Sequence, residues 1–121
     1  MIGIGLDAVE VDRFRRVLQR TPGVARRLFT DAERAYGEGS PDPAPRLAAR
    51  FAAKEATMKA LGVGLGAFRF RDVEVVRAPT GAPSLRVAGR AAVLAAEQGV
   101  TTWRVSLTHT ESMAEAVVVA Q

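Results

Sequence analysis

The residues best suited to chemistry lie close together between Arg50 and Gly62, in the stretch Arg-Phe-Ala-Ala-Lys-Glu-Ala-Thr-Met-Lys-Ala-Leu-Gly. The chain has 17 basic residues, and its only lysines, Lys54 and Lys59, both fall here. A lysine ammonium is a compact charge whose pKa responds to its surroundings, whereas an arginine stays charged. Glu55 precedes Lys59 by four positions, so on a helix the two side chains share a face. Such pairs are also common on solvated surfaces, where each adds only about 0.3–0.5 kcal/mol, so a plain surface ion pair remains an alternative.

A further candidate, Asp7, follows an alternating run of small and apolar residues that predicts a strand over residues 1–7. Gly3 and Gly5 would let the backbone of this strand approach a neighbouring element closely. A carboxylate where a core strand ends either faces a ligand or caps the following helix, and the sequence is compatible with both.

Asp7, Glu55 and Lys59 together would suit metal-assisted phosphoryl transfer. Magnesium prefers oxygen ligands and usually takes one or two carboxylates together with substrate phosphates. A nearby ammonium would neutralise phosphate charge or move a proton. The rival assembly is a Ser-His-acid hydrolase using Ser106 and the only histidine, His109, but it requires a nucleophile elbow such as G-x-S-x-G, which the chain lacks.

Length and composition indicate a soluble protein of one domain spanning residues 1–121. The absence of cysteine excludes disulfides and thiolate metal sites and fits a reducing compartment. The N-terminus has no basic segment ahead of an apolar run, and no apolar stretch approaches the roughly 20 residues of a membrane span. We therefore expect a cytoplasmic location and no membrane partner.

The positive charge is concentrated near the N-terminus, although the formal net charge is only +4. Six arginines fall within fifteen residues: Arg13, Arg15, Arg16, Arg20, Arg26 and Arg27. This density indicates an acidic partner, either nucleic acid, phosphate or an acidic protein. A nucleic-acid module would need stacking or base-reading side chains nearby, for which only Phe14 and Phe29 are candidates.

The periodicities predict an α+β fold, with a small, mostly antiparallel sheet packed by a long central helix and by shorter helices. Strands are expected at 1–7, 68–77, 84–87, 102–108 and 113–120, and helices at 9–20, 31–37, 46–61 and 89–98. Thr30 and Glu33 have the spacing of a capping box, and Gly62 is placed to end the long helix. The apolar positions shift in phase near Arg71, which predicts a bulge or break there.

Three motifs carry a family resemblance that runs along the whole chain. They are Gly3-Ile4-Gly5-Leu6-Asp7 followed by Glu10 and Arg13, then Arg50-Phe51-Ala52-Ala53-Lys54-Glu55-Ala56 with Lys59-Ala60-Leu61-Gly62, then Val105-Ser106-Leu107-Thr108-His109-Thr110. In this order they closely resemble the bacterial holo-acyl-carrier-protein synthases, the short trimeric class of 4′-phosphopantetheinyl transferases. The resemblance implies the 4′-phosphopantetheinyl transferase fold, assembled as a homotrimer with active sites between protomers.

The resemblance also implies a reaction. Coenzyme A would supply 4′-phosphopantetheine to a serine of apo-acyl carrier protein, with release of adenosine 3′,5′-bisphosphate, in fatty-acid or polyketide biosynthesis. Asp7 and Glu55 would hold Mg²⁺, and Lys59 would contact the phosphates and serve proton transfer or the leaving group. Glu55, or a metal-ordered water beside it, would activate the serine.

The remaining implied roles concern coenzyme A and the carrier protein. Residues expected to line the coenzyme A site are Arg50, Lys54, Lys59, Gly62, Pro83, Ser106, His109 and Thr110, with His109 near the 3′-phosphate. Residues expected to dock the acidic carrier protein are Arg13, Arg16, Val17 and Arg20, so the arginines need no nucleic-acid partner. Met58 departs from the family, whose members often have serine at that position, so a hydroxyl contact to coenzyme A would be lost or replaced.

Overall fold

The computed structural model describes all 121 residues and has five strands, five α-helices and one short 3-10 helix. In chain order they are β1 (Gly3–Glu10), α1 (Val11–Arg20), α2 (Val24–Leu28), α3 (Asp31–Glu38), α4 (Ala44–Ala60), η1 (Phe70–Asp72), β2 (Val73–Arg77), β3 (Pro83–Val87), α5 (Gly89–Glu97), β4 (Trp103–His109) and β5 (Met113–Ala120). The expected α+β class is confirmed. No helix is long and apolar enough to cross a membrane.

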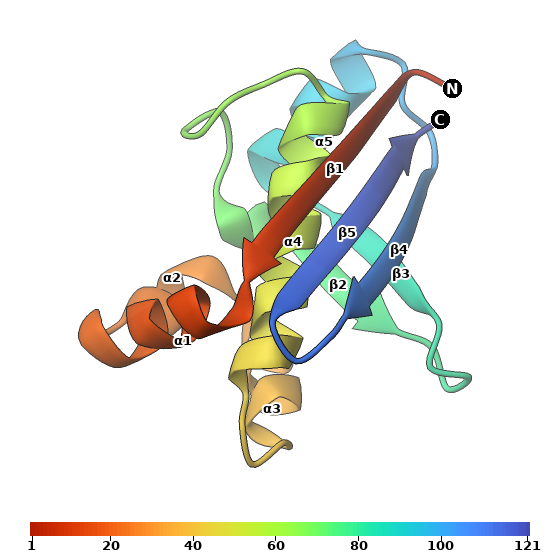
Figure 1. The fold of residues 1–121 in the computed structure, drawn as a ribbon. Helices are drawn as coiled ribbons and strands as arrows, with labels where there is room; N and C mark the ends of the chain where they lie inside the picture. The colour runs from red at the N-terminus through yellow and green to blue at the C-terminus, as the bar shows by residue number, and fades with distance from the viewer.

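The strands form two small antiparallel sheets. One has the order β1-β5-β4, and the other is the β2-β3 hairpin. Helix α4 runs behind the three-stranded sheet, α1 and α2 project to one side, and both chain termini lie at the same end (Figure 1). Twelve of the seventeen residues of α4 are buried, so this helix is the centre of the molecule.

Small residues let α4 lie very close to β1. A side-chain carbon built on Gly5 would stand 1.8 Å from the carbonyl oxygen of Ala56, and one built on Gly3 would be equally close to that of Ala60. The predicted close approach of this strand is therefore confirmed, and its partner is the helix that carries Glu55. Ala52, Ala53, Ala56 and Ala60 form the rest of this contact, packed against Ala116, Val118 and Ala120 of β5.

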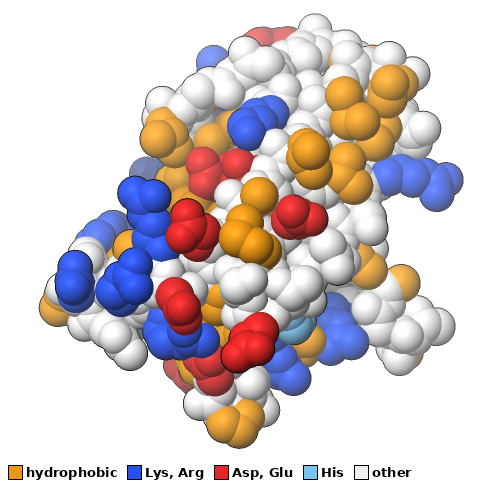
Figure 2. Space-filling view, in the orientation of Figure 1, with side chains coloured by type: hydrophobic (Ala, Val, Ile, Leu, Met, Phe, Trp, Pro, Cys, Tyr) orange, Lys and Arg blue, Asp and Glu red, His pale blue; other side chains and the backbone are white.

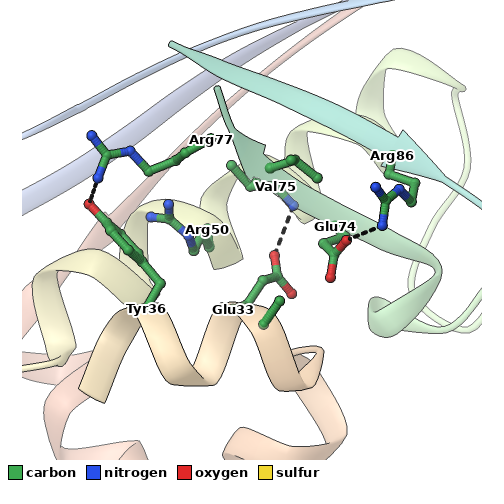
Figure 3. Close-up of a pocket in the computed structure, with 9 residues that line it drawn as sticks. Glu33, Tyr36, Arg50, Glu74, Val75, Arg77 and Arg86 are labelled. Carbon is green, nitrogen blue, oxygen red and sulfur yellow. Dashed lines mark hydrogen bonds and ion pairs between the residues drawn. The ribbon is translucent and has the colours of Figure 1, made fainter. Parts of the chain in front are cut away.

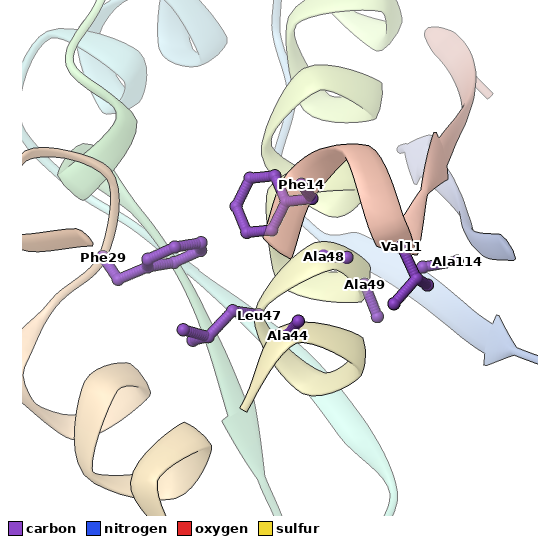
Figure 4. Close-up of a cluster of buried hydrophobic side chains, with 8 residues drawn as sticks. All are labelled: Val11, Phe14, Phe29, Ala44, Leu47, Ala48, Ala49 and Ala114. Atoms are coloured by element: carbon purple, nitrogen blue, oxygen red, sulfur yellow. The ribbon is translucent and has the colours of Figure 1, made fainter. Parts of the chain in front are cut away.

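Larger side chains fill the core beyond the two ends of this alanine contact. Toward the start of α4, Phe14 of α1 and Phe29 pack around Leu47 and the neighbouring alanines (Figure 4). Toward its end, Met58 and Leu61 pack against Phe68, Val73 and α5. These two clusters fix the helix along its whole length, so its exposed charged side chains project from a rigid frame.

Two local signals in the sequence are confirmed. Thr30 caps α3, accepting a hydrogen bond from the Glu33 backbone while the Glu33 carboxylate accepts one from the Thr30 backbone. Gly62 ends α4 in the left-handed region at φ +68°, where the Val63 amide donates to the Met58 carbonyl.

Two expected boundaries were wrong. The first strand does not stop at Asp7 but continues to Glu10, because residues 3–10 pair without interruption with β5. The expected strand over 68–77 begins only at Val73, since Phe70–Asp72 forms a turn of 3-10 helix at the predicted break.

The outer face of β1 is apolar and open to solvent. Ile2, Ile4 and Leu6 are 44%, 56% and 64% exposed. Ile4 pairs with Val119 and Leu6 with Val117 on the same side of β5. Hydrophobic side chains gather over these two strands (Figure 2).

Candidate functional site

Asp7, Glu55 and Lys59 come together where β1 crosses α4. The Lys59 ammonium donates to the Leu6 carbonyl oxygen at 2.9 Å and to the Asp7 carboxylate at 3.3 Å. The Asp7 side chain is 15% exposed and the Lys59 side chain 57%, so a partly buried carboxylate lies beneath an accessible ammonium. Lys59 thus pairs with Asp7 across two elements, in addition to sharing a helix face with Glu55.

Burial raises the pKa of Glu55 above its usual value, and the negative charge of Asp7 raises it further. Lys59 opposes this shift, and a hydrogen bond with Asp7 adds to it. Two carboxylates held this close repel each other when both are ionised, so a cation between them would relieve the repulsion.

The donor set fits a magnesium ion that is also bound by phosphate. Asp7 and Glu55 supply carboxylate oxygens, and the structure has no group of three or more acidic, histidine or cysteine side chains that could enclose a metal. Magnesium commonly takes one or two carboxylates and completes its shell with water and substrate phosphates. Lys59 adds a positive charge at the place where those phosphates would lie.

An apolar groove of about 630 Å³ opens beside Glu55. Its lining residues come from β1, α1, α2, α4, the loop after α4, η1 and the start of β5: Ala8, Val9, Glu10, Arg13, Phe14, Val17, Val24, Leu28, Phe51, Glu55, Leu65, Phe70 and Met113. Two of the predicted docking residues, Arg13 and Val17, are among them. Val17 is 38% exposed at the border of this groove.

A second concave site lies at the other end of α4. Arg50, Pro83 and His109 line it together with the ring of Tyr36 and two further arginines, Arg46 and Arg77. The guanidinium carbons of Arg46, Arg50 and Arg77 lie 4.2, 4.1 and 4.9 Å from the centre of the tyrosine ring. Sequence reasoning had no signal for Tyr36, because its partners are separated from it by ten to forty-one positions.

The lining of this pocket contains no acidic residue, although the charge of Glu33 acts on Arg50 from its other side. None of Arg46, Arg50 and Arg77 forms an ion pair, and Arg77 instead donates to the Tyr36 hydroxyl at 2.7 Å (Figure 3). Arg50 is only 5% exposed, and its Nε is buried without a hydrogen-bond partner. Burial lowers the pKa of Arg50. Such concentrated, unpaired positive charge is suited to a phosphate group.

Lys54 does not line the surface, which corrects its expected role at the coenzyme A site. Its ammonium is fully buried and forms an ion pair of 2.8 Å with the Glu33 carboxylate. It also donates to the carbonyl oxygens of Phe70, at 3.0 Å, and of Val73. With these three acceptors the ammonium has none of its donors left for a ligand.

Glu33 therefore has a second role that the capping pattern did not predict. Its other carboxylate oxygen accepts from the Val75 amide at 2.9 Å, which ties α3 to β2 (Figure 3). The pair of Glu33 and Lys54 links α3, α4 and the start of the hairpin.

Ser106, Thr110 and Met58 line neither the groove nor the arginine-lined pocket. Ser106 is on the exposed outer face of β4, whereas His109 lies with Leu107 in the arginine-lined pocket, so no Ser-His pair forms. The Thr110 hydroxyl accepts from the Ser112 and Met113 amides and thereby holds the β4–β5 turn. Met58 is buried in the core and offers no surface contact.

The fold and site define a small α+β protein with two carboxylates and a lysine beside a groove and a separate cationic pocket. Residues 3–119 match the 4′-phosphopantetheinyl transferase superfamily. The chain therefore belongs to this superfamily.

Individual relatives are more specific. A holo-acyl-carrier-protein synthase of Streptomyces avermitilis is 50% identical over 121 residues, covering 100% of this chain and 98% of the relative. The crystal structure of the Neisseria meningitidis holo-acyl-carrier-protein synthase superimposes with a TM-score of 0.89 at 32% identity, covering 100% of this chain and 98% of that one. The Helicobacter pylori synthase, solved in complex with coenzyme A, has a TM-score of 0.85 at 28% identity, over 98% and 99% of the two chains.

Proposed function

We propose that this chain is a holo-acyl-carrier-protein synthase, acting as one domain over residues 1–121. It transfers the 4′-phosphopantetheine of coenzyme A to a serine of apo-acyl carrier protein and releases adenosine 3′,5′-bisphosphate. The observation that carries the proposal is the meeting of Asp7, Glu55 and Lys59 beside the apolar groove, in a chain that is 50% identical to a synthase of this name along its whole length.

In this reaction the serine oxygen forms a bond to the β-phosphorus of coenzyme A, and the bond from that phosphorus to the bridging oxygen breaks. The serine proton passes to Glu55 or to a water beside it, because Glu55 is the carboxylate that lines the groove where the serine would enter. Lys59 neutralises charge on the phosphates and on the departing oxygen. The groove excludes water around the reacting serine.

Asp7 and Glu55 would hold Mg²⁺, which would neutralise phosphate charge and orient the pyrophosphate for in-line attack. Their oxygen donors, and the absence of sulfur and histidine beside them, suit magnesium or manganese. The arginine-lined pocket is proposed to take the 3′-phosphate of coenzyme A, with His109 and Arg50 as contacts, and with Pro83 at its edge.

The positions of Arg50 and Lys59 support a coenzyme A site built between protomers. They are nine positions apart on α4, which corresponds to about 14 Å along the axis and about 180° around it. One coenzyme A cannot readily reach both faces of a buried helix. We therefore propose a homotrimer in which each molecule of coenzyme A lies between Lys59 of one protomer and the arginine pocket of the partner subunit. The apolar outer face of β1 and β5 supplies a surface for such an assembly.

Mass spectrometry of an acidic apo-acyl carrier protein incubated with the enzyme, coenzyme A and Mg²⁺ tests the activity directly. We expect one pantetheine adduct per carrier. Glu55→Gln should reduce the rate by more than about a hundredfold, since it removes a charged group from the reacting centre. Glu97→Gln, an exposed change on α5, is the matched control and should retain the wild-type rate. Wild-type enzyme that yields no adduct, or Glu55→Gln at the wild-type rate, contradicts the proposal.

A further inference from the structure

Tyr36 is the meeting point of the three arginines in the arginine-lined pocket. It projects from α3, whereas Arg46 and Arg50 lie one turn apart on α4 and Arg77 is the last residue of β2 (Figure 3). The three guanidinium carbons lie 4.1–4.9 Å from the centre of its ring. The tyrosine thus joins side chains from α4 and β2, which are far apart in the sequence.

Each arginine contacts a different part of Tyr36. Arg46 donates to its backbone carbonyl oxygen at 2.8 Å, Arg50 packs over its ring, and Arg77 donates to its hydroxyl at 2.7 Å. A guanidinium has five N–H donors. Arg46 uses one of them and Arg77 uses two, the second on the Gly81 carbonyl oxygen at 3.5 Å. Most of their donors therefore stay available for a ligand while the groups themselves are held in place.

An aromatic ring holds the arginines together without cancelling their charge. Burial lowers the pKa of Arg50, and the charges of Arg77 and Arg46 lower it further, so the three like charges repel one another. A carboxylate at the position of Tyr36 would relieve this repulsion, but it would also repel an incoming phosphate. The negative face of a ring attracts cations and adds no net charge. The pocket therefore keeps its full positive charge for an anion.

We infer that Tyr36 is the positioning residue that makes the enzyme prefer coenzyme A over 3′-dephospho-coenzyme A. It acts through Arg46, Arg50 and Arg77, whose free donors it holds ready for the 3′-phosphate. A site built to bond one group of a substrate rejects the analogue that lacks this group, because polar groups of the site are then left unpaired. The inference rests on the proposed function, since it names what selects the substrate at the same site.

Calorimetric binding of two nucleotides to the assembled enzyme tests this inference without catalysis. Adenosine 3′,5′-bisphosphate carries the 3′-phosphate and adenosine 5′-monophosphate lacks it, so the ratio of their Kd values measures the preference. Tyr36→Leu removes both the ring and the hydroxyl and should reduce this preference at least about tenfold. Tyr36→Phe keeps the ring beside Arg46 and Arg50 and releases only Arg77, so it should reduce the preference about threefold.

Transfer assays give a second measurement. The same variants should raise KM for coenzyme A in the same order and have less effect on KM for 3′-dephospho-coenzyme A, because only coenzyme A carries the phosphate. Arg34→Leu is the matched control, since it removes a positive charge from the same helix but lies outside the arginine-lined pocket. It should keep the wild-type preference.

The inference is overturned if Tyr36→Leu keeps the wild-type preference, or if it weakens binding of both nucleotides equally, which would assign Tyr36 to the adenosine or to the fold. An equal loss in Arg34→Leu would overturn it as well. Should Tyr36→Leu not fold, Tyr36→Phe at the wild-type preference overturns the inference. Wild-type enzyme that binds the bisphosphate no better than the monophosphate contradicts the proposed placement of the 3′-phosphate and the inference with it. Wild-type enzyme that has the preference but transfers nothing contradicts only the proposed activity.

Discussion

Removing the buried cation Lys54 tests how α4 is held in place. Lys54→Met would remove the 2.8 Å partner of the Glu33 carboxylate and the ammonium that donates to the carbonyl oxygens of Phe70 and Val73. Both charged side chains are 0% exposed, so water cannot replace the lost contacts. Breaking a buried pair from one side typically costs about 3–5 kcal/mol. Because domains of this size unfold with about 5–15 kcal/mol, we expect a loss of about a fifth or more of the stability.

The reverse change, Glu33→Gln, should have a different signature. Burial already lowers the pKa of Lys54, and the Glu33 charge opposes that shift, so its removal lowers the pKa further. The folded state would then bind fewer protons than the unfolded state, in which lysines titrate near about 10.4. Stability should therefore rise with pH, by at most about 1.4 kcal/mol per pH unit for one proton.

Urea unfolding, followed by the fluorescence of Trp103, measures both effects at pH 6 and pH 9. The control is Asp31→Asn, which breaks only exposed pairs, with Arg34 and Arg71, and should cost less than about 1 kcal/mol. The reasoning is refuted if Lys54→Met costs no more than this control. A Glu33→Gln variant whose stability does not change with pH would refute the assigned role of Lys54 burial.

Two other predictions concern the contact between β1 and α4. Gly5→Ala should unfold the protein or force β1 away from the helix, because the added side-chain carbon would stand 1.8 Å from the Ala56 carbonyl oxygen. Calorimetric melting measures the loss of stability. A melting temperature equal to that of the wild type would contradict the close packing. Burial and the charge of Asp7 raise the folded-state pKa of Glu55, so the stability of the protein falls as pH rises through that pKa. Glutamine carries no charge and avoids this loss. In the presence of a chelator, Glu55→Gln should therefore raise the melting temperature at neutral pH. The gain should vanish below pH of about 4, where an unfolded glutamate is also protonated, and a gain that persists there would contradict this origin.

Short-range chemistry made several features predictable from the sequence. The glycines at positions 3 and 5 and the alanines of α4 have no side chains that would keep two backbones apart, so their pattern predicts close packing. Capping at Thr30 and termination at Gly62 depend on residues within a few positions of each other. For the same reason the i, i+4 spacing of Glu55 and Lys59 correctly predicts a shared face.

Features that depend on distant partners were missed. The burial of Lys54 requires Glu33 and two backbone carbonyls from η1 and β2, and no local pattern distinguishes a buried lysine from a ligand-binding one. The end of β1 was misplaced because its last residues are held in the strand by pairing with β5, a distant partner. The two faces of β1 were also hard to assign, because the outer face is apolar while the inner face carries Gly3, Gly5 and Asp7. This reverses the usual relation between hydrophobicity and burial, since the outer face is left open in a single chain.

The two faces of α4 permit a decisive test of the proposed trimer. If coenzyme A lies between Glu55 of one protomer and Arg50 of the partner subunit, then Glu55→Gln and Arg50→Ala damage opposite halves of each site. Mixed and reassembled trimers would contain some sites in which both halves are intact. With equal mixing of subunits in a cyclic assembly, about one quarter of the sites should be restored, and activity should recover to about that fraction of wild type. If both residues served one coenzyme A within a single protomer, every site would keep one defect. Mixing would then restore nothing, and the interfacial site would be refuted.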